Sequence, residues 1–146
     1  MTKNEISAGV MPFMVRDGEI EVLTVNARTG DWEFPKGGVE NGEELQQTAT
    51  RELAEETNIS DVRLVDSFST SYSYSFYWEG KPVDKTVHLY LGEVFLPESV
   101  SLSEEHSEYK WLSVDETLNQ LTHDGMKNAL RNGISHLENN SKHPFE

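Results

Sequence analysis

Residues 37–59 read GGVENGEELQQTATRELAEETNI, a glycine-containing loop followed by an amphipathic helix. The pattern predicts a helix that begins near Asn41, with Glu44 three residues later as its capping-box partner, and runs to about Thr57. Asn58 is expected to end it, because Asn tolerates the left-handed conformation that helix ends often require. Residues 28–42 ahead of the helix carry several Gly and a Pro and are predicted to be a loop.

Carboxylates lie on the inner face of this predicted helix. The apolar stripe consists of Leu45, Ala49 and Leu53. At about 100° per residue, Glu56 falls within this stripe, Glu52 lies beside it, and Glu55 is about 60° from Glu52 on the other side. A buried carboxylate without a partner is strongly destabilising, so this arrangement requires either a cation or a raised pKa.

Three carboxylates at positions i, i+3 and i+4 can share hard divalent cations, and ligation by oxygen alone indicates Mg²⁺ or Mn²⁺. Arg51 is expected to pair with Glu55 one turn on, or with a loop carboxylate such as Glu43. The alternative is an ordinary amphipathic helix whose acids pair with Lys and Arg from elsewhere. The chain has only 12 Lys and Arg against 26 Asp and Glu, which disfavours that alternative.

Composition limits the functional classes. The chain has 146 residues and a formal net charge of −14, so its long-range field repels nucleic-acid backbones and anionic membranes. We therefore expect neither duplex nucleic acid nor a membrane as a partner. The absence of Cys excludes disulfides, thiolate metal sites and a cysteine nucleophile. Short apolar runs and an N-terminus without signal-peptide character favour a cytoplasmic location.

Strands and helices alternate along the rest of the chain. A hairpin is predicted from Ile6–Val15 and Glu19–Val25, with Pro12 indicating an edge strand or a bulge. Later elements are expected as strands at Val62–Trp78 and Thr86–Leu96 around a turn at 79–82, a strand at Tyr109–Leu112, and helices at 115–121 and 124–137. This mixture predicts an α/β (mixed α+β) class, with one domain over 1–137 and a frayed polar tail over 138–146.

The central stretch resembles the Nudix box. Gly37, five residues, Glu43, seven residues and then Arg51-Glu52-Leu53-Ala54-Glu55-Glu56-Thr57-Asn58-Ile59 match the family pattern, except that Asn58 replaces the last Gly. Other segments resemble one branch of the family, the asymmetrical bis(5′-nucleosyl)-tetraphosphatases: residues 7–10, 32–40, 85–87, 105–106, 111–112 and 126–130. The resemblance implies a Nudix α/β/α sandwich with a central mixed sheet and a catalytic loop-helix-loop.

The resemblance also implies a function. Members of that branch are Mg²⁺-dependent hydrolases, typically cleaving diadenosine tetraphosphate to ATP and AMP, so we expect a small nucleotide substrate and a monomer or weak dimer. Alternatives are other Nudix substrates, such as 5′-triphosphate RNA ends, diphosphoinositol polyphosphates or oxidised nucleotides. A non-catalytic nucleotide-binding regulator is a further alternative, which the complete set of box carboxylates disfavours.

Site residues follow from the same resemblance. Glu52, Glu55 and Glu56 are expected to bind Mg²⁺, or Mn²⁺ in its place, with Glu105 and the Lys36 backbone carbonyl as further ligands. The expected catalytic set is Arg51, Glu52, Glu55, Glu56 and Glu105, and Gly37, Glu43 and Asn58 are the structural positions of the box.

Substrate contacts are expected from both cationic and aromatic residues. The resemblance assigns Lys36 and Lys85 to the phosphates, and His106 to a phosphate or a water near the metal. The aromatic contacts to the base are predicted at Tyr77 and Tyr90, with Tyr74 and Trp78 as other candidates on the same hairpin.

Overall fold

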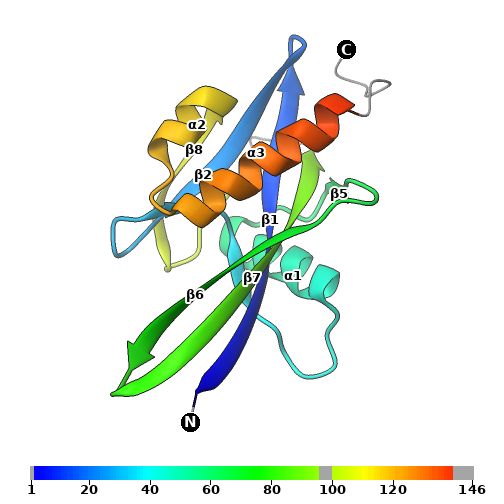
Figure 1. The fold of residues 1–146 in the computed structure, drawn as a ribbon. Coiled ribbons are helices and arrows are strands. Elements are labelled where there is room, and N and C mark those ends of the chain that lie inside the picture. Colours follow the sequence, from blue (N-terminus) through cyan, green and yellow to red (C-terminus); the bar gives the residue numbers. More distant parts are fainter. Residues whose placement is uncertain (1, 96–99, 140–146) are drawn as a thin grey trace.

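The computed structural model describes residues 2–95 and 100–139 (Figure 1). The elements in chain order are β1 Lys3–Arg16, β2 Glu19–Ala27, β3 Trp32–Glu33, β4 Lys36–Gly38, α1 Leu45–Thr57, β5 Val62–Leu64, β6 Thr70–Trp78, β7 Lys81–Val94, β8 His106–Ser113, α2 Val114–Gln120 and α3 Asp124–Asn139. Two parts of the sequence prediction, Leu96 at the end of a strand and residues 140–146 of the tail, lie outside the described residues.

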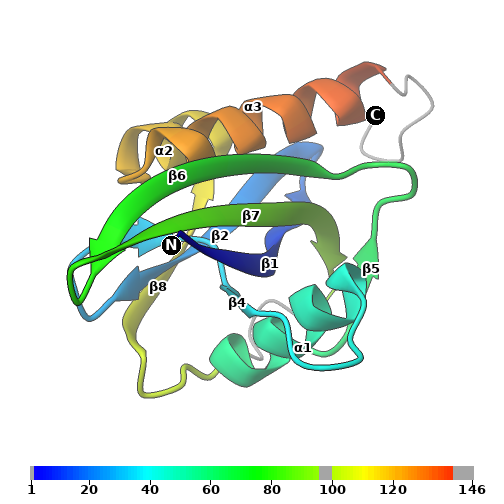
Figure 2. The ribbon, with the colours of Figure 1, turned by 60° about the horizontal axis from the view of Figure 1, so that its bottom comes forward.

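One mixed sheet forms the middle layer. Its principal order is β3-β2-β1-β7-β5, with β4 paired to β1, β6 to β7 and β8 to β2. The β1–β7 pair is parallel and the other pairs are antiparallel. Figure 2 shows α1 on one face of the sheet and α2 and α3 on the other. The predicted α/β/α arrangement with a mixed sheet is therefore confirmed.

Each face of the sheet buries its own apolar cluster. The larger one joins β1 and β7 to α3, with Phe13, Leu89 and Leu130 at its centre. The smaller one joins the opposite face of the same strands to α1, through Val10 and Leu53. Because successive strand residues point to opposite faces, β1 and β7 serve both clusters. The smaller cluster sets the position of α1, and with it the orientation of the helix's carboxylates.

Helix α1 begins later than predicted. Its N-cap is Glu44, and the capping box is formed by Glu44 and Gln47, whose side chain accepts the Glu44 backbone N–H at 2.8 Å. The predicted box of Asn41 and Glu44 is wrong because Gly42 has a φ of 84°, which interrupts helical geometry. The predicted end is confirmed: Asn58 is left-handed, with a φ of 64°, and its N–H donates to the Ala54 carbonyl.

Two strand predictions need correction. The predicted loop over 28–42 contains β3 and β4, which pair with β2 and β1. The predicted strand over 62–78 is two strands, β5 and β6, separated by a turn in which Ser67 has a φ of 60°. Both pair with the same edge of β7, at Gly92–Val94 and at Lys81–Leu89, so the chain must leave the sheet between them.

Pro12 lies in a central strand rather than at the predicted edge. On one side β1 pairs with β7 throughout this region. On its other side β1 pairs first with β4, at Ser7–Gly9, and then with β2, at Phe13–Arg16. Pro12 falls in the gap between these two partners, where the N–H that proline lacks is not required by either ladder.

The C-terminal helices agree with the prediction. Helix α3 extends two residues further than expected, so Glu138 and Asn139 of the predicted tail are helical. Gly133 is buried against the Leu91 side chain, which brings this helix close to β7. Within the described part of the chain, no helix is long and apolar enough to cross a membrane.

Candidate active site

Helix α1 presents its three box glutamates to three different environments. Glu56 is buried at 3% exposure, the Glu52 side chain is 14% exposed, and the Glu55 side chain is 58% exposed. Strand β4 passes directly over Glu52, and a Cβ on Gly37 would overlap the Glu52 carboxylate. The first glycine of the box is therefore required for the close approach of loop and helix.

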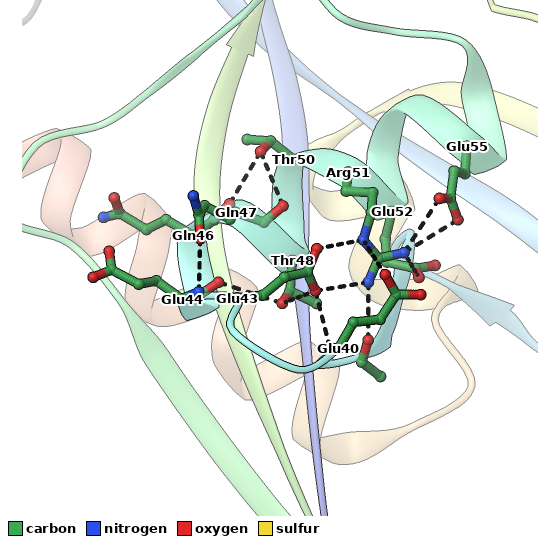
Figure 3. Close-up of polar contacts among 11 residues, drawn as sticks. Glu40, Glu43, Glu44, Gln46, Gln47, Thr48, Thr50, Arg51, Glu52 and Glu55 are labelled. Carbon is green, nitrogen blue, oxygen red and sulfur yellow. Dashed lines mark hydrogen bonds and ion pairs between the residues drawn. The ribbon is translucent and has the colours of Figure 1, made fainter.

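Arg51 holds the outer carboxylates together (Figure 3). Its Nε donates to Glu43 Oε2 at 2.6 Å and its Nη2 to Glu43 Oε1 at 3.0 Å. Its Nη1 donates to Glu52 Oε2 at 2.7 Å and to both oxygens of Glu55 at 3.3 Å. The guanidinium lowers the pKa of Glu43 to about 2, with help from the Glu40 backbone N–H. We name Glu43, Glu52 and Glu55 with Arg51 the arginine-bound set.

A second group of carboxylates surrounds Glu56. Lys36 Nζ lies 4.0 Å from Glu33 Oε1, but no Lys or Arg of the described residues pairs with Glu56 itself. His106 Nε2 lies 3.1 Å from Glu33 Oε2 and 3.7 Å from Glu56 Oε1, and the His106 side chain is almost fully buried. Burial raises the pKa of Glu56, as do the hydrogen bond that the protonated Glu56 carboxyl donates to Glu52 and the charges of Glu52, Glu105 and Glu33. We name Glu33, Glu56 and Glu105 with His106 the inner set.

The inner set fits a divalent cation. Glu56 Oε1 is a buried oxygen with no hydrogen-bond partner within the described structure. The neighbouring carboxylates also raise the pKa of Glu56, which shows that the site lacks positive charge. A bound cation would supply the missing partner and the missing positive charge. The described residues contain no ready-made cluster of three or more metal-ligating side chains, and Arg51 turns Glu52 and Glu55 toward itself. Completing a ligand set with Glu52 therefore requires a shift of its side chain.

An open pocket lies at the inner set. Its volume is about 590 Å³, and its polar lining comprises Arg28, Glu33, Lys36, Glu56, Glu104, Glu105 and His106. The fold thus brings Lys36, Glu56, Glu105 and His106 together from three separate segments, as the assignment of all four to one site requires. Arg28 Nε donates to the Glu104 carbonyl and ties the loop before β8 to the end of β2.

A second pocket shares Lys36 with the first. It has a volume of about 340 Å³ and is lined by Lys36, Tyr72, Ser73, Tyr74, His123, Asp124 and Gly125. The rings of Tyr72 and Tyr74 are stacked, with centroids 6.2 Å apart. This wall of aromatic rings, next to a lysine, is suited to a flat ring that carries an anionic substituent.

Lys85 lies across from Tyr74 in the β6–β7 ladder. Burial lowers the pKa of its ammonium group, and the charge of Lys36 lowers it further, whereas Glu5 and Glu33 oppose the shift. The two lysines are therefore close enough to interact, and a polyanion between them would relieve their repulsion.

The two predicted aromatic contacts lie elsewhere. Tyr90 is buried beneath α1, in the apolar cluster with Leu53. Tyr77 is 76% exposed and, two residues along the strand from Ser75, points to the face of β6 opposite Tyr72 and Tyr74. Neither residue lines either pocket, so the base contacts at Tyr77 and Tyr90 stay predictions that this geometry does not support.

The pocket residues that the sequence prediction missed include Arg28, Glu33, Tyr72 and His123. Glu33 stands in the segment Trp-Glu-Phe-Pro-Lys, so its position next to Lys36 was an available signal. Tyr72 could have been found by the two-residue strand period, since it shares a face with Tyr74. Nothing in the local sequence indicates that Arg28 and His123 approach the site, because long-range packing brings them there.

Comparisons with known proteins agree with this geometry. The family model described as NUDIX domain matches residues 3–133. An asymmetrical bis(5′-nucleosyl)-tetraphosphatase of Caenorhabditis elegans is 31% identical over 127 residues, 86% of this chain and 91% of that protein. The Sus scrofa protein of the same description is 40% identical over 123 residues, 81% of each chain.

A solved structure is similar over nearly the whole chain. It is the crystal structure of a C. elegans Ap4A hydrolase binary complex, with a TM-score of 0.83 and 29% sequence identity, covering 92% of this chain and 98% of that one. With the family match spanning most of the sequence and the box acids arranged as described, the chain belongs to the Nudix hydrolase family.

Proposed function

We propose that this protein hydrolyses dinucleoside polyphosphates and cleaves diadenosine tetraphosphate asymmetrically to ATP and AMP, in the cytoplasm and with Mg²⁺ as its cofactor. One observation carries the proposal: a buried carboxylate cluster and an aromatic pocket lie next to each other and share Lys36. The relatives described as asymmetrical bis(5′-nucleosyl)-tetraphosphatases support the same substrate class.

The inner set supports the chemical step. Glu56, with Glu52 and the Lys36 backbone carbonyl, would hold Mg²⁺, and Glu55 and Glu105 would complete its surroundings. When bound, the metal would supply charge neutralisation of the phosphates and a lowered pKa of the attacking water. Glu105 lines the same pocket as Glu56, and its carboxylate would orient this water and accept its proton.

Two lysines support recognition of a chain of phosphates. Lys36 borders both pockets, and Lys85 is close enough for the charge of Lys36 to lower its pKa. Each would act as a compact positive charge on a different phosphate. Arg28 at the rim of the first pocket supplies a third cation on the same path.

The second pocket supports binding of one adenine. Tyr74 is 44% exposed, and its ring lies between those of Tyr72 and Phe76, at centroid distances of 6.2 and 5.9 Å. The exposed part of this row of rings would contact the base. With one adenine bound in the second pocket, the chain of phosphates would run past Lys36 to the carboxylates of the first pocket. This path favours a nucleotide over an inositol polyphosphate, which has no base to stack.

The first test is product analysis. Purified protein with Mg²⁺ and diadenosine tetraphosphate is expected to release AMP and ATP in equal amounts, with all release abolished by EDTA. Chromatographic separation of the nucleotides measures this. Two molecules of ADP would indicate cleavage at the central phosphate bridge and contradict the proposed asymmetric cleavage. No products, with turnover of a 5′-triphosphate RNA instead, would overturn the substrate proposal.

A second test uses a matched pair of tyrosines on β6. Tyr74→Leu is expected to raise KM for diadenosine tetraphosphate by about 10-fold or more, since loss of base stacking weakens binding by about 1–3 kcal/mol. Tyr77→Leu, on the opposite face of the strand, is expected to leave KM unchanged. Equal effects of the two variants would contradict the placement of the base in the second pocket.

A further inference from the structure

Strand β8 contains a β-bulge where it passes the end of β2. Asn26 of β2 lies opposite Glu108, but the next residue, Ala27, lies opposite His106, so Ser107 is one residue in excess on β8. Because side chains alternate between the two faces of a strand, a regular β8 would place Ser107 opposite Ala27 and turn His106 to the other face. The bulge reverses this, and bulges next to active sites often serve to change the direction of a side chain.

The bulge turns His106 to the face of the sheet that packs against α1. Val25 of β2 pairs with Tyr109 of β8 on one side and with Glu33 of β3 on the other, so these three side chains share that face. Ala27, two residues along β2, belongs to the same face, and so does its partner His106. His106 and Glu33 therefore project from the two neighbours of β2 on one side of the sheet.

The His106 ring has one hydrogen bond in the described structure. Its Nε2 lies 3.1 Å from Glu33 Oε2 and 3.7 Å from Glu56 Oε1, and its Nδ1 is buried with no partner. An ionised carboxylate only accepts hydrogen bonds, so the ring nitrogen is the donor to Glu33. The separation of 3.7 Å is too long for a hydrogen bond, so Glu56 Oε1 keeps its lone pairs for a cation.

Glu33 is held at both oxygens of its carboxylate. Oε2 accepts from His106, and Oε1 lies 4.0 Å from Lys36 Nζ. The Glu33 side chain is 17% exposed and lines the same pocket as Glu56 and Glu105. Its charge is one of those that raise the pKa of Glu56. The negative charge of Glu33 is therefore directed to the place where a cation would bind.

We propose that His106 is a positioning residue: turned inward by the bulge, it donates a hydrogen bond to Glu33 and holds that carboxylate beside Glu56, where its charge strengthens binding of the divalent cation. This inference rests on the cation site of the proposed function. It assigns His106 a role other than the predicted contact with a phosphate or a water. Residues that orient the carboxylates of a metal site typically change metal affinity or activity by about 10–100-fold when they are replaced.

Nitrogen-15 NMR of the metal-free protein tests the hydrogen bond without metal or substrate. His106 should carry a hydrogen on Nε2 in the wild type, and the chemical shift of this nitrogen should change in Glu33→Gln. A hydrogen on Nδ1 alone overturns the proposal, because Nε2 would then have nothing to donate to Glu33.

Two amide variants test which position of the ring acts. In His106→Gln the side-chain NH₂ can reach the position of Nε2, whereas in His106→Asn it reaches only as far as Nδ1. Calorimetric titration with Mn²⁺ should give a dissociation constant about 10-fold or more higher for His106→Asn, and one close to that of the wild type for His106→Gln. Thermal unfolding in EDTA verifies that both variants fold. Equal dissociation constants of the two variants overturn the proposal.

A double-mutant cycle tests whether His106 acts through Glu33. Glu33→Gln should weaken Mn²⁺ binding, since it removes the charge that His106 holds in place. Adding His106→Leu to this variant should weaken binding no further, although His106→Leu alone weakens it. Additive losses contradict the proposal, because His106 would then act independently of Glu33. A wild-type protein that binds no Mn²⁺ would overturn the proposed cation site together with this inference.

The dependence of hydrolysis on Mg²⁺ separates positioning from direct catalysis. His106→Leu should need about 10-fold more Mg²⁺ for half its maximal rate on diadenosine tetraphosphate, and saturating Mg²⁺ should restore most of the wild-type rate. A lower rate at saturating Mg²⁺, with an unchanged requirement for the metal, overturns the proposal, because His106 would then contact the substrate or the attacking water. The titrations with Mn²⁺ remain decisive if diadenosine tetraphosphate is not the substrate.

Discussion

The two groups of carboxylates at α1 each include residues of this helix, and they differ in what neutralises their negative charge. In the arginine-bound set, the guanidinium of Arg51 contacts Glu43, Glu52 and Glu55 within 3.3 Å. In the inner set, Glu56 has no cation of the chain within hydrogen-bond distance in the described structure, and one of its oxygens has no partner. The pKa of Glu43 is lowered and that of Glu56 is raised accordingly.

This difference shows that some residues of the box stabilise the fold and others are available to a ligand. A group whose charge is neutralised by the protein itself stabilises the fold, and its side chain must move away from that partner before it can bind a further cation. A group buried without that neutralisation destabilises the fold until a ligand supplies the charge. The box thus uses Arg51 and Glu43 to anchor the loop to the helix and leaves Glu56 for the metal.

The largest expected effect comes from Glu56→Gln. We expect hydrolysis of diadenosine tetraphosphate to fall by about 10³-fold, because the amide cannot supply an anionic ligand. The metal-free variant should nevertheless be at least as stable as the wild type, since the free-energy cost of keeping a buried ionisable carboxyl protonated is removed. Activity assays, with thermal unfolding in EDTA, measure both effects.

A calorimetric titration with Mn²⁺ serves as the control that does not depend on turnover. Glu56→Gln should lose most of the heat of binding that the wild type shows. Full turnover in this variant, or undiminished Mn²⁺ binding, would contradict the role assigned to the inner set.

Arg51→Gln should act mainly on stability. It removes the partner of three carboxylates, so we expect the free energy of unfolding to fall by about 1–2 kcal/mol, after allowance for partial solvent exposure. The matched control is Arg63→Gln. Arg63 pairs with Glu93 at 2.6 Å on the surface, where loss of the pair should cost less than about 0.5 kcal/mol. Urea unfolding compares the two, and equal losses would contradict a special role for Arg51.

The pH dependence of stability should have opposite signs in the two sets. The pKa of Glu43 is lowered from 4.5 to about 2, so its contribution is complete above pH 4.5 and is lost as the pH falls through 2. The pKa of Glu56 is raised, so the metal-free protein should lose stability as the pH rises from 4.5.

Unfolding in EDTA at a series of pH values measures these slopes. Glu43→Gln should weaken the acid-side decline relative to the wild type, and Glu56→Gln should weaken the loss at higher pH. Identical profiles for the two variants would show that the two sets are not electrostatically distinct.

The smallest expected effect concerns Asn58. Since its φ is 64°, Asn58→Gly should change the free energy of unfolding by no more than about 0.5 kcal/mol, whereas Asn58→Ala should cost about 1 kcal/mol. Thermal unfolding measures both. A large loss in the glycine variant would mean that the Asn58 side chain contributes to the site and is more than a helix end.

Local patterns predicted the parts of the site that depend on a single helix. The 3.6-residue period placed Glu56 among the buried residues of α1, and the structure confirms its burial. The same period does not determine where a helix begins: the left-handed Gly42 and the Glu43 contacts with Arg51 move the first turn to Leu45. Capping depends on the preceding loop, whose conformation is set by contacts eight residues away.

The base contact shows where a single sequence is insufficient. Tyr74, Tyr77 and Tyr90 are equally plausible aromatic contacts in the sequence. The two-residue strand period shows which residues share a face of the sheet, but it does not show which helix or loop packs on that face. The packing of α3 on β6 turned the Tyr72 and Tyr74 face into a pocket, and the packing of α1 on β7 buried Tyr90.

By itself, the sequence determined the family, the box helix and its inner carboxylates, because these follow from spacing along one helix. Tertiary structure alone decided that Glu33, Glu105 and His106 surround Glu56, that Lys36 borders two pockets, and which tyrosines face the second. These contacts join residues up to 73 positions apart in the chain, as Glu33 and His106 are. Their proximity results from sheet order and helix packing, which no local period encodes.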